Sequence, residues 1–220
     1  MTIRVLPFAA AATALGLCAM PAAAQMIGNP VYYSPKHGLG LSIQGDFGRG
    51  LNDASGKTNY FGGRAVLGLP MITVSAGAGV VDNSSSEVTF GGTVSVNVLS
   101  APLLPVAVAL QGGAGYMSSG GGSVLSAPIG IALAVKPPTP GINVEVWGAP
   151  RIQITRVSAG GSSATETDVG ASAGANLGLP TGLGLHAAVD WINAEPEGAI
   201  RVGVGVHYKF TIPGLGMMGM

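Results

Sequence analysis

Few residues of this sequence have the type and spacing needed for catalysis or metal binding. The chain has 220 residues, with three histidines and one cysteine. His37, His186 and His207 are isolated from one another, and Cys18 lies in a segment that we expect to be removed. The carboxylates near predicted loops have no base or nucleophile beside them, so we interpret them as solvated charge; they are Asp82, Glu87, Glu166, Asp168, Glu195 and Glu197. The sequence therefore predicts no enzymatic activity, no metal and no cofactor.

Other polar residues share one face of alternating segments and are candidates for an internal polar network. They are Arg64, Glu145, Arg151, His186, Asp190 and Arg201. If the last hairpin turns near Glu195 and Pro196, Asp190 lies directly opposite Arg201. Charges withdrawn from water need partners, so this pair would staple the interior; the alternative is a constriction that selects ions. Glu145, Arg151 and Arg64 are candidates for a second network.

The rest of this polar face consists of small residues, namely glycine, alanine, serine and threonine. Small side chains would leave free volume for a narrow water-filled pore, which Trp147 would partly block. The sequence leaves both a plugged and an open interior possible.

These side chains must be positioned by β-strands, because apolar and polar residues alternate with a period of two. The clearest segments are Val88 to Val98 and Ile200 to Phe210. Ten strands are predicted, over 38–48, 59–69, 71–81, 87–99, 104–117, 124–136, 141–156, 165–179, 183–193 and 199–211. Their lengths suit membrane strands of about 9–11 residues. No charge falls on the apolar face, where it would cost about 2–4 kcal/mol at mid-membrane.

The composition agrees with a membrane barrel. Only 9% of residues are charged and 47% are hydrophobic, whereas soluble domains carry roughly 25% charge. A membrane helix needs about 20 apolar residues in a row, and no such run follows the N-terminal region. We therefore predict an all-β fold, a closed antiparallel up-and-down transmembrane β-barrel. The net charge of zero gives no indication of nucleic-acid binding.

The connections between the predicted strands alternate in character. One set is short and contains proline, around Pro70, 102–105, 137–141 and 180–182. The other set is polar and mostly longer, at 49–59, 82–86, 118–123, 157–164 and 194–198. Outer-membrane barrels have short periplasmic turns and longer extracellular loops. This pattern favours ten strands, an even number that places both termini of the chain in the periplasm. A misassigned turn would make the count eight or twelve.

The N-terminus has the features of a secretory signal peptide. Arg4 precedes an apolar stretch, and Ala22-Ala23-Ala24 offers a cleavage site before Gln25. Leu17 before Cys18 argues against lipidation of this cysteine. The alternative to a cleaved signal peptide is a retained membrane anchor. The predicted organisation is a signal peptide at 1–24, a periplasmic segment at 25–37, the barrel at 38–211 and a tail at 212–220.

Aromatic residues fall where a membrane interface would place them, because Trp and Tyr favour the headgroup region. Those near the loop ends of their strands are Phe47, Phe61, Phe90, Tyr116 and Trp191. Near the turn end of the last strand lie Tyr208 and Phe210. We predict that these residues form two aromatic belts.

The last strand, Val202 to Phe210, resembles the C-terminal assembly signal of bacterial outer-membrane proteins, with Tyr208 and Phe210 matching its aromatic positions. In that family the final aromatic residue is usually terminal, whereas here Thr211 to Met220 follow it. The mature chain resembles the small outer-membrane β-barrel superfamily of the OmpA, OmpX and opacity-protein types. The resemblance implies outer-membrane localisation, with membrane lipid, the barrel assembly machinery and periplasmic chaperones as partners. A monomer is compatible with it.

Three functions are compatible with this sequence. The first is a structural outer-membrane barrel or a narrow passive pore for small solutes. The second is a surface adhesion or interaction protein that uses its extracellular loops, although the loops reach only about a dozen residues. The third is a soluble β-barrel or a lipid-binding periplasmic protein; a soluble barrel would turn its apolar face inward.

Overall fold

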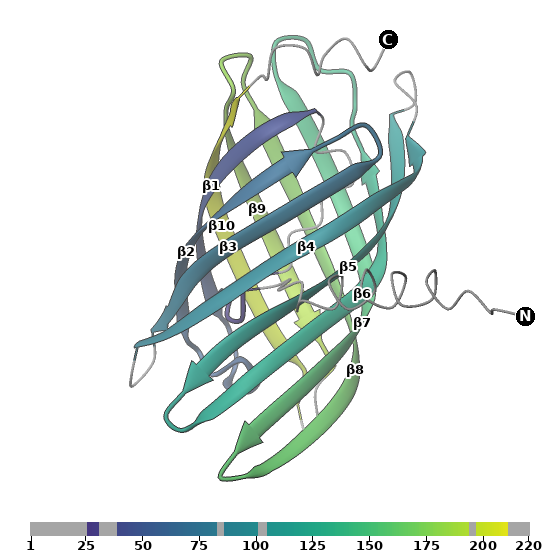
Figure 1. Cartoon of the computed structure of the whole chain (residues 1–220). Coiled ribbons are helices and arrows are strands. Elements are labelled where there is room, and N and C mark those ends of the chain that lie inside the picture. Colours follow the sequence, from purple (N-terminus) through teal and green to yellow (C-terminus); the bar gives the residue numbers. More distant parts are fainter. Residues whose placement is uncertain (1–25, 31–38, 83–85, 101–104, 194–196, 211–220) are drawn as a thin grey trace, which may run out of the picture.

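The protein folds into one closed, all-antiparallel β-barrel, shown by a computed structural model (Figure 1). The structure describes residues 26–30, 39–82, 86–100, 105–193 and 197–210. The strands are β1 (Gly40–Gly50), β2 (Asn59–Gly68), β3 (Ile72–Asp82), β4 (Ser86–Ser100), β5 (Val106–Ser119), β6 (Gly122–Val135), β7 (Asn143–Ala159), β8 (Ser162–Gly178), β9 (Leu183–Ile192) and β10 (Ala199–Phe210). Each strand pairs with its sequence neighbours, and β1 pairs with β10. The prediction of ten strands is confirmed, and the alternatives of eight and twelve are wrong.

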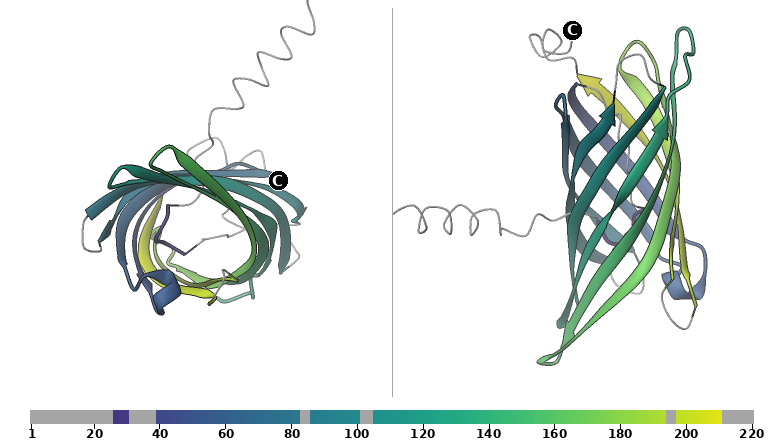
Figure 2. Two further views of the ribbon diagram at one scale, coloured as in Figure 1. Left: turned by 90° about the horizontal axis from the view of Figure 1, so that it is seen from below. Right: turned by 90° about the vertical axis from the view of Figure 1, so that its right-hand side faces the viewer.

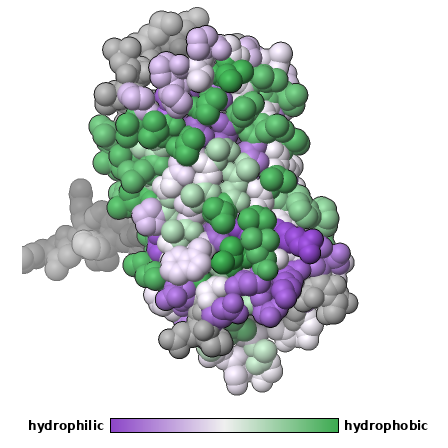
Figure 3. Space-filling model, turned by 180° about the vertical axis from the view of Figure 1, so that it is seen from behind, coloured by the Kyte–Doolittle hydropathy of each residue, from purple (hydrophilic) through white to green (hydrophobic). Residues whose placement is uncertain are grey.

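The two faces of the barrel wall differ in polarity. In β9, exposed Leu183 and Leu185 alternate with buried Gly184 and His186. The same alternation places apolar side chains on the outside all around the wall, and Figure 3 shows them covering much of one side. A soluble barrel would have the opposite arrangement. An apolar exterior around a polar interior, with no open seam, is the architecture of an outer-membrane β-barrel.

The seam between β1 and β10 closes the barrel and is fastened at the loop end. Leu41 pairs with Phe210 and Gly50 with Arg201, so the register is continuous along the seam. A short 3-10 helix, η1 (Asp53–Ser55), follows β1 and is capped by Asn52. The Asn52 side chain also donates to the Gly198 carbonyl at 2.5 Å and accepts from the Ile200 amide at 3.1 Å. This one side chain therefore ties the β1–β2 loop to the start of β10.

The η1 loop also carries an exposed ion pair. The Lys57 ammonium lies 2.6 Å from the Asp53 carboxylate. The hydrogen bond that Lys57 donates to Asp53, together with the negative charge of Asp53, raises the pKa of Lys57 above its usual range. Both side chains are largely exposed, so water and salt screen this pair.

Two predicted loops are largely strand. The segments 118–123 and 157–164 were expected to be loops, but β5 and β6 are joined by Gly120–Gly121 alone, and β7 and β8 by Gly160–Gly161 alone. All four glycines have positive φ, as the type I′ hairpin turn requires. This turn continues the strand twist, so pairing extends to the hairpin tips. The predicted difference in connection length between the two barrel ends is therefore wrong for these hairpins.

Some predictions concern residues that the structure does not describe. The signal peptide at 1–24 and the tail at 212–220 lie outside the described residues. Among the residues that are described, no helix is long and apolar enough to cross a membrane.

Candidate functional site: the barrel lumen

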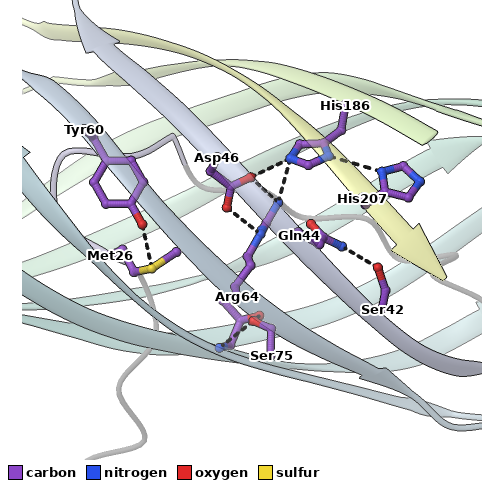
Figure 4. Close-up of polar contacts among 10 residues, drawn as sticks. Met26, Ser42, Gln44, Asp46, Tyr60, Arg64, Ser75, His186 and His207 are labelled. Atoms are coloured by element: carbon purple, nitrogen blue, oxygen red, sulfur yellow. Dashed lines mark hydrogen bonds and ion pairs between the residues drawn. The ribbon is translucent and has the colours of Figure 1, made fainter. Parts of the chain in front are cut away.

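The first polar cluster of the lumen lies across the β1–β10 seam. Arg64 on β2 approaches Asp46 on β1, with 3.0 Å between Nε and Oδ2. His186 on β9 lies 2.5 Å from the other oxygen of Asp46, and its Nδ1 is 3.2 Å from Nδ1 of His207 on β10. Figure 4 shows these four side chains as a chain of contacts. We call them the seam cluster.

Two glycines make room for the histidines of the seam cluster. A Cβ atom at Gly205 would lie 2.3 Å from Nε2 of His186, and one at Gly184 would lie 2.2 Å from Nε2 of His207. Gly205 is directly opposite His186 on the neighbouring strand, and Gly184 is opposite His207. Each ring therefore lies over the strand beside its own, which only glycine permits.

The second cluster is centred on Arg151 and Asp190, and we call it the Arg151 cluster. The guanidinium donates two nearly parallel bonds to the carboxylate, of 2.7 Å (Nη1–Oδ1) and 3.0 Å (Nη2–Oδ2). Ser172 bridges the pair, accepting from Arg151 at 2.8 Å and donating to Asp190 at 2.7 Å. Arg151 also donates to Gln153 at 3.1 Å, and Gln153 hydrogen-bonds to Ser126. Bidentate arginine–carboxylate pairs are among the strongest polar contacts in proteins.

The sequence predicted the register around Asp190 correctly but not its partner. Asp190 does lie opposite Arg201 in the β9–β10 pairing. Its oxygens nevertheless bond to Arg151, two strands away. The Arg151 guanidinium crosses β8 over Gly170, where a Cβ would be 3.2 Å from its Cζ. Arg201 lies close enough to interact electrostatically with both residues, but its buried Nε has no hydrogen-bond partner among the described residues.

The contacts of the second predicted network, among Glu145, Arg151 and Arg64, lie in different parts of the lumen. Glu145 accepts a hydrogen bond of 3.1 Å from Asn176 on the adjacent strand. Arg151 belongs to the cluster on β7 to β9, and Arg64 belongs to the seam cluster on the opposite wall. Alternation indicates that a side chain faces inward, but the order of strands around the barrel decides which side chains meet.

The N-terminal segment contributes directly to the lumen. Residues 25–37 were predicted to lie in the periplasm, but residues 26–30 lie inside the barrel wall (Figure 2, left view). The Ile27 amide donates to the Thr89 hydroxyl at 2.9 Å, and the Tyr60 hydroxyl donates to the Met26 sulfur at 2.7 Å. Met26 is buried against Tyr60 and Val81. We call residues 26–30 the internal segment.

Close approach of the internal segment depends on the wall of β1 and on the seam cluster. A Cβ at Gly48 would lie 3.1 Å from the Gly28 carbonyl and 3.2 Å from the Asn29 side-chain oxygen. The Asn29 side chain also hydrogen-bonds to Asp46. The internal segment and the seam cluster are therefore one connected structure across the lumen.

Tyr60 is the residue of this site that the sequence analysis missed. It is fully buried, and its ring lies against Gly62 on its own strand and Gly79 on β3. A Cβ at Gly79 would lie within 2.5 Å of two ring carbons and the hydroxyl oxygen of Tyr60. The available signal was the alternation itself, because Tyr60 has the same parity as inward-facing Arg64 on β2.

Adding a methyl group at Gly79 is expected to disturb this packing. Gly79→Ala should destabilise the barrel by about 1–3 kcal/mol, because the buried Tyr60 ring and Met26 must move to avoid overpacking. The matched control is Gly63→Ala on neighbouring β2, where the nearest atom to a new Cβ is 3.4 Å away. Urea unfolding of both variants, refolded in detergent, measures the difference. Equal stabilities would show that the Tyr60 ring is not tightly held.

Between these clusters and the turn end of the barrel, the lumen contains a chamber of about 150 Å³. Its lining combines hydroxyl and amide groups with the charged side chains of Lys136, Lys209 and Glu145. Its lining includes Arg64, His186 and His207, and it reaches the β8–β9 turn at Leu179 and Gly182. Trp147, which was expected to obstruct the lumen, packs against Gly174 and a group of alanines on the wall. The chamber therefore lies in the turn half of the lumen, whereas the Arg151 cluster and the internal segment lie in its loop half.

The predicted belt residues are exposed on the outer surface. Phe47 and Phe61 are paired across β1 and β2 with ring centroids 5.1 Å apart, and Phe90 lies opposite Tyr116. Trp191 is also exposed. At the other end of the barrel, Tyr208 and Phe210 form an edge-to-face pair with ring centroids 4.8 Å apart.

No group of three or more metal-ligating side chains occurs among the residues that the structure describes.

No protein-family model and no curated protein matches the chain. Solved structures with a similar fold include the beta domain of the Bordetella autotransporter BrkA (11% identity, covering 78% of this chain and 99% of that one, TM-score 0.48). The N-terminal β-barrel domain of Pseudomonas aeruginosa OprF has 12% identity over 77% and 96% of the two chains, with a TM-score of 0.36.

The outer membrane protease OmpT from Escherichia coli is similar at 10% identity over 78% and 94% of the two chains, with a TM-score of 0.38. These likenesses are distant, and the proteins differ in role among themselves. They transfer no activity to this chain, and the expectation that it is not an enzyme stays a prediction.

Proposed function

We propose that this protein is a narrow outer-membrane channel for small polar solutes, closed by the internal segment. The observation that carries the proposal is the nature of the closure. In its loop half the lumen holds residues 26–30, which belong to no strand and pack against Tyr60 and Val81, whereas the turn half contains a polar chamber. A short segment held by side-chain contacts can leave the lumen without breaking any strand pair.

The contacts of the internal segment have the strength expected of a reversible closure. Each of its neutral hydrogen bonds contributes about 0.5–1.5 kcal/mol, and burial of the Met26 side chain adds about 1.5–3 kcal/mol. A few kcal/mol in total keeps the segment in place most of the time and still populates an open state. The Arg151 cluster joins strands of the wall and would remain in place during opening.

The proposal includes a location and an orientation. The apolar exterior supports insertion in the outer membrane, with lipid around the strands. Strand β1 begins and strand β10 ends at the turn end of the barrel, where Leu41 pairs with Phe210. We place this end in the periplasm, with the β5–β6 and β7–β8 hairpins outside the cell. Tyr208 and Phe210 are proposed as an internal assembly signal. Cleavage near Ala24 is proposed as the step that separates the internal segment from the signal peptide.

A disulfide that locks the internal segment tests the channel proposal. The Ile27 amide nitrogen is 2.9 Å from the Thr89 hydroxyl, so the two chain segments are in contact here and this pair is the one to replace by cysteines. The sequence has no other cysteine than Cys18. We expect Ile27→Cys/Thr89→Cys to be silent in planar bilayers when oxidised and to show stepwise conductance after reduction.

The single variant Ile27→Cys is the control and should respond to neither treatment. Equal conductance of the double variant before and after reduction would show that the segment does not close the lumen. Silence under both conditions, with a folded barrel, would exclude the channel itself and leave a structural role.

A further inference from the structure

At its loop end, strand β8 has one edge that no described strand pairs with, and we call it the open edge. It pairs with β7 from Ser162 to Gly178, but its pairing with β9 begins only at Gly170. Residues 162–168 therefore have a strand on one side and no paired strand among the described residues on the other. Figure 1 shows the β7–β8 hairpin extending past the ends of its neighbours.

The direction of the backbone N–H and C=O groups at this edge follows from the hydrogen bond that Val169 makes. The Val169 carbonyl points to the β9 side, because it accepts from the Asn193 amide at 2.8 Å. Residues of one parity in an antiparallel strand direct both backbone polar groups to the same neighbour. The N–H and C=O groups of Ser163, Thr165 and Thr167 therefore point to the open edge. The residues from Ser162 to Thr167 are all exposed.

Two carboxylates stand beside this edge on one face of the sheet. Glu166 and Asp168 are two positions apart, so they project from the same face. Neither forms a salt bridge with a cation among the residues that the structure describes. Their strand neighbours across β7, Thr155 and Gln153, are uncharged.

From this geometry we infer that the open edge of β8 binds an extended segment of another protein with lysine or arginine at every second position. The segment would join the sheet as an added antiparallel strand, with Ser163, Thr165 and Thr167 providing the backbone bonds. Residues directly opposite one another on a shared face interact, so alternate cations would meet Glu166 and Asp168. Backbone pairing would supply affinity, and the two carboxylates would supply selectivity.

A second copy of this chain fits the edge less well. Two identical edges that pair antiparallel are related by a two-fold axis perpendicular to the sheet. Because the strands run along the barrel, this axis would invert one barrel relative to the other. Two chains in the same membrane cannot adopt that arrangement, which favours a peptide from a different protein.

The test uses the full mature chain, refolded in detergent, and a labelled peptide of alternating threonine and lysine. We expect saturable binding by fluorescence anisotropy, and no binding of the same peptide with glutamate in place of lysine. Hydrogen exchange should slow at the amides of Ser163, Thr165 and Thr167 when the lysine peptide is present. Unchanged exchange at all three amides would overturn the proposed site.

The decisive variant is Thr165→Pro. Its amide faces the open edge, where proline is tolerated because no bond to β7 is lost. We expect about tenfold weaker binding, equivalent to about 1.4 kcal/mol, with Thr165→Val binding as the wild type does. Glu166→Gln/Asp168→Asn should weaken binding severalfold and reduce its dependence on salt. Equal binding by Thr165→Pro, or a change in oligomeric mass in place of peptide binding, would refute the inference.

Discussion

Asp190→Asn is expected to lower the free energy of unfolding by about 3–5 kcal/mol, because it removes one partner of a buried ion pair. The Arg151 and Asp190 side chains are almost fully buried, and Arg201 lies nearby. Without the carboxylate, two guanidinium groups face each other inside the barrel with no compensating charge. Urea unfolding followed by tryptophan fluorescence measures the loss.

The matched control for this substitution is Asp82→Asn at the exposed end of β3. The same change of chemistry there should alter stability by less than about 0.5 kcal/mol. The double variant Arg151→Gln/Asp190→Asn should lose less than the sum of its single variants, because the two residues are in contact. Additive losses would contradict the pairing, and would favour the Arg201 partnership that the register alone suggested.

Tyr60→Ala is expected to open the lumen. The ring fills the space between β2, β3 and Met26, and its hydroxyl holds the Met26 sulfur. Losing this apolar contact removes about 1.5–3 kcal/mol from the closed state, which raises the open population about tenfold or more. Uptake of small sugars by liposomes containing the variant should increase accordingly.

Phe61→Ala is the control for Tyr60→Ala, because it removes an adjacent aromatic ring from the same strand. Phe61 points outward and is 54% exposed, so the lumen should be unchanged. Hydrogen exchange of the Ile27 amide reports the position of the internal segment independently of transport. Faster exchange without greater uptake would mean that the segment moves but that another group blocks the lumen.

Much of the fold was predictable from the sequence because a membrane barrel imposes simple local rules. Each strand must alternate in polarity, be long enough to cross the membrane, and end at a turn. Those requirements are visible in Val88 to Val98 without knowledge of any contact. Even the register of Asp190 against Arg201 followed from counting outward from one hairpin. The ends of β7 and β8 were missed because a polar glycine-containing segment suits a loop and a type I′ hairpin equally well.

The candidate site was only partly predictable. Alternation identified Arg64, Arg151, His186 and Asp190 as inward-facing, but it carries no information about which strands face one another across the lumen. Gly170 decides the partner of Asp190, since its missing side chain lets Arg151 reach across β8. Glycine in a strand pattern is compatible with many features, and only the folded structure shows which large side chain occupies the space.

The sequence by itself determined the barrel, its strand count and the polarity of its two faces, because these follow from local alternation and composition. Only the tertiary structure decided the contents of the lumen: the Arg151 cluster, the seam cluster and the internal segment. The placement of Met26 beside Tyr60 joins residues 34 positions apart, and nothing in the short segment before β1 distinguishes the periplasm from the barrel interior. That distinction depends on the space that Gly48 and Gly79 leave open once the sheet has closed.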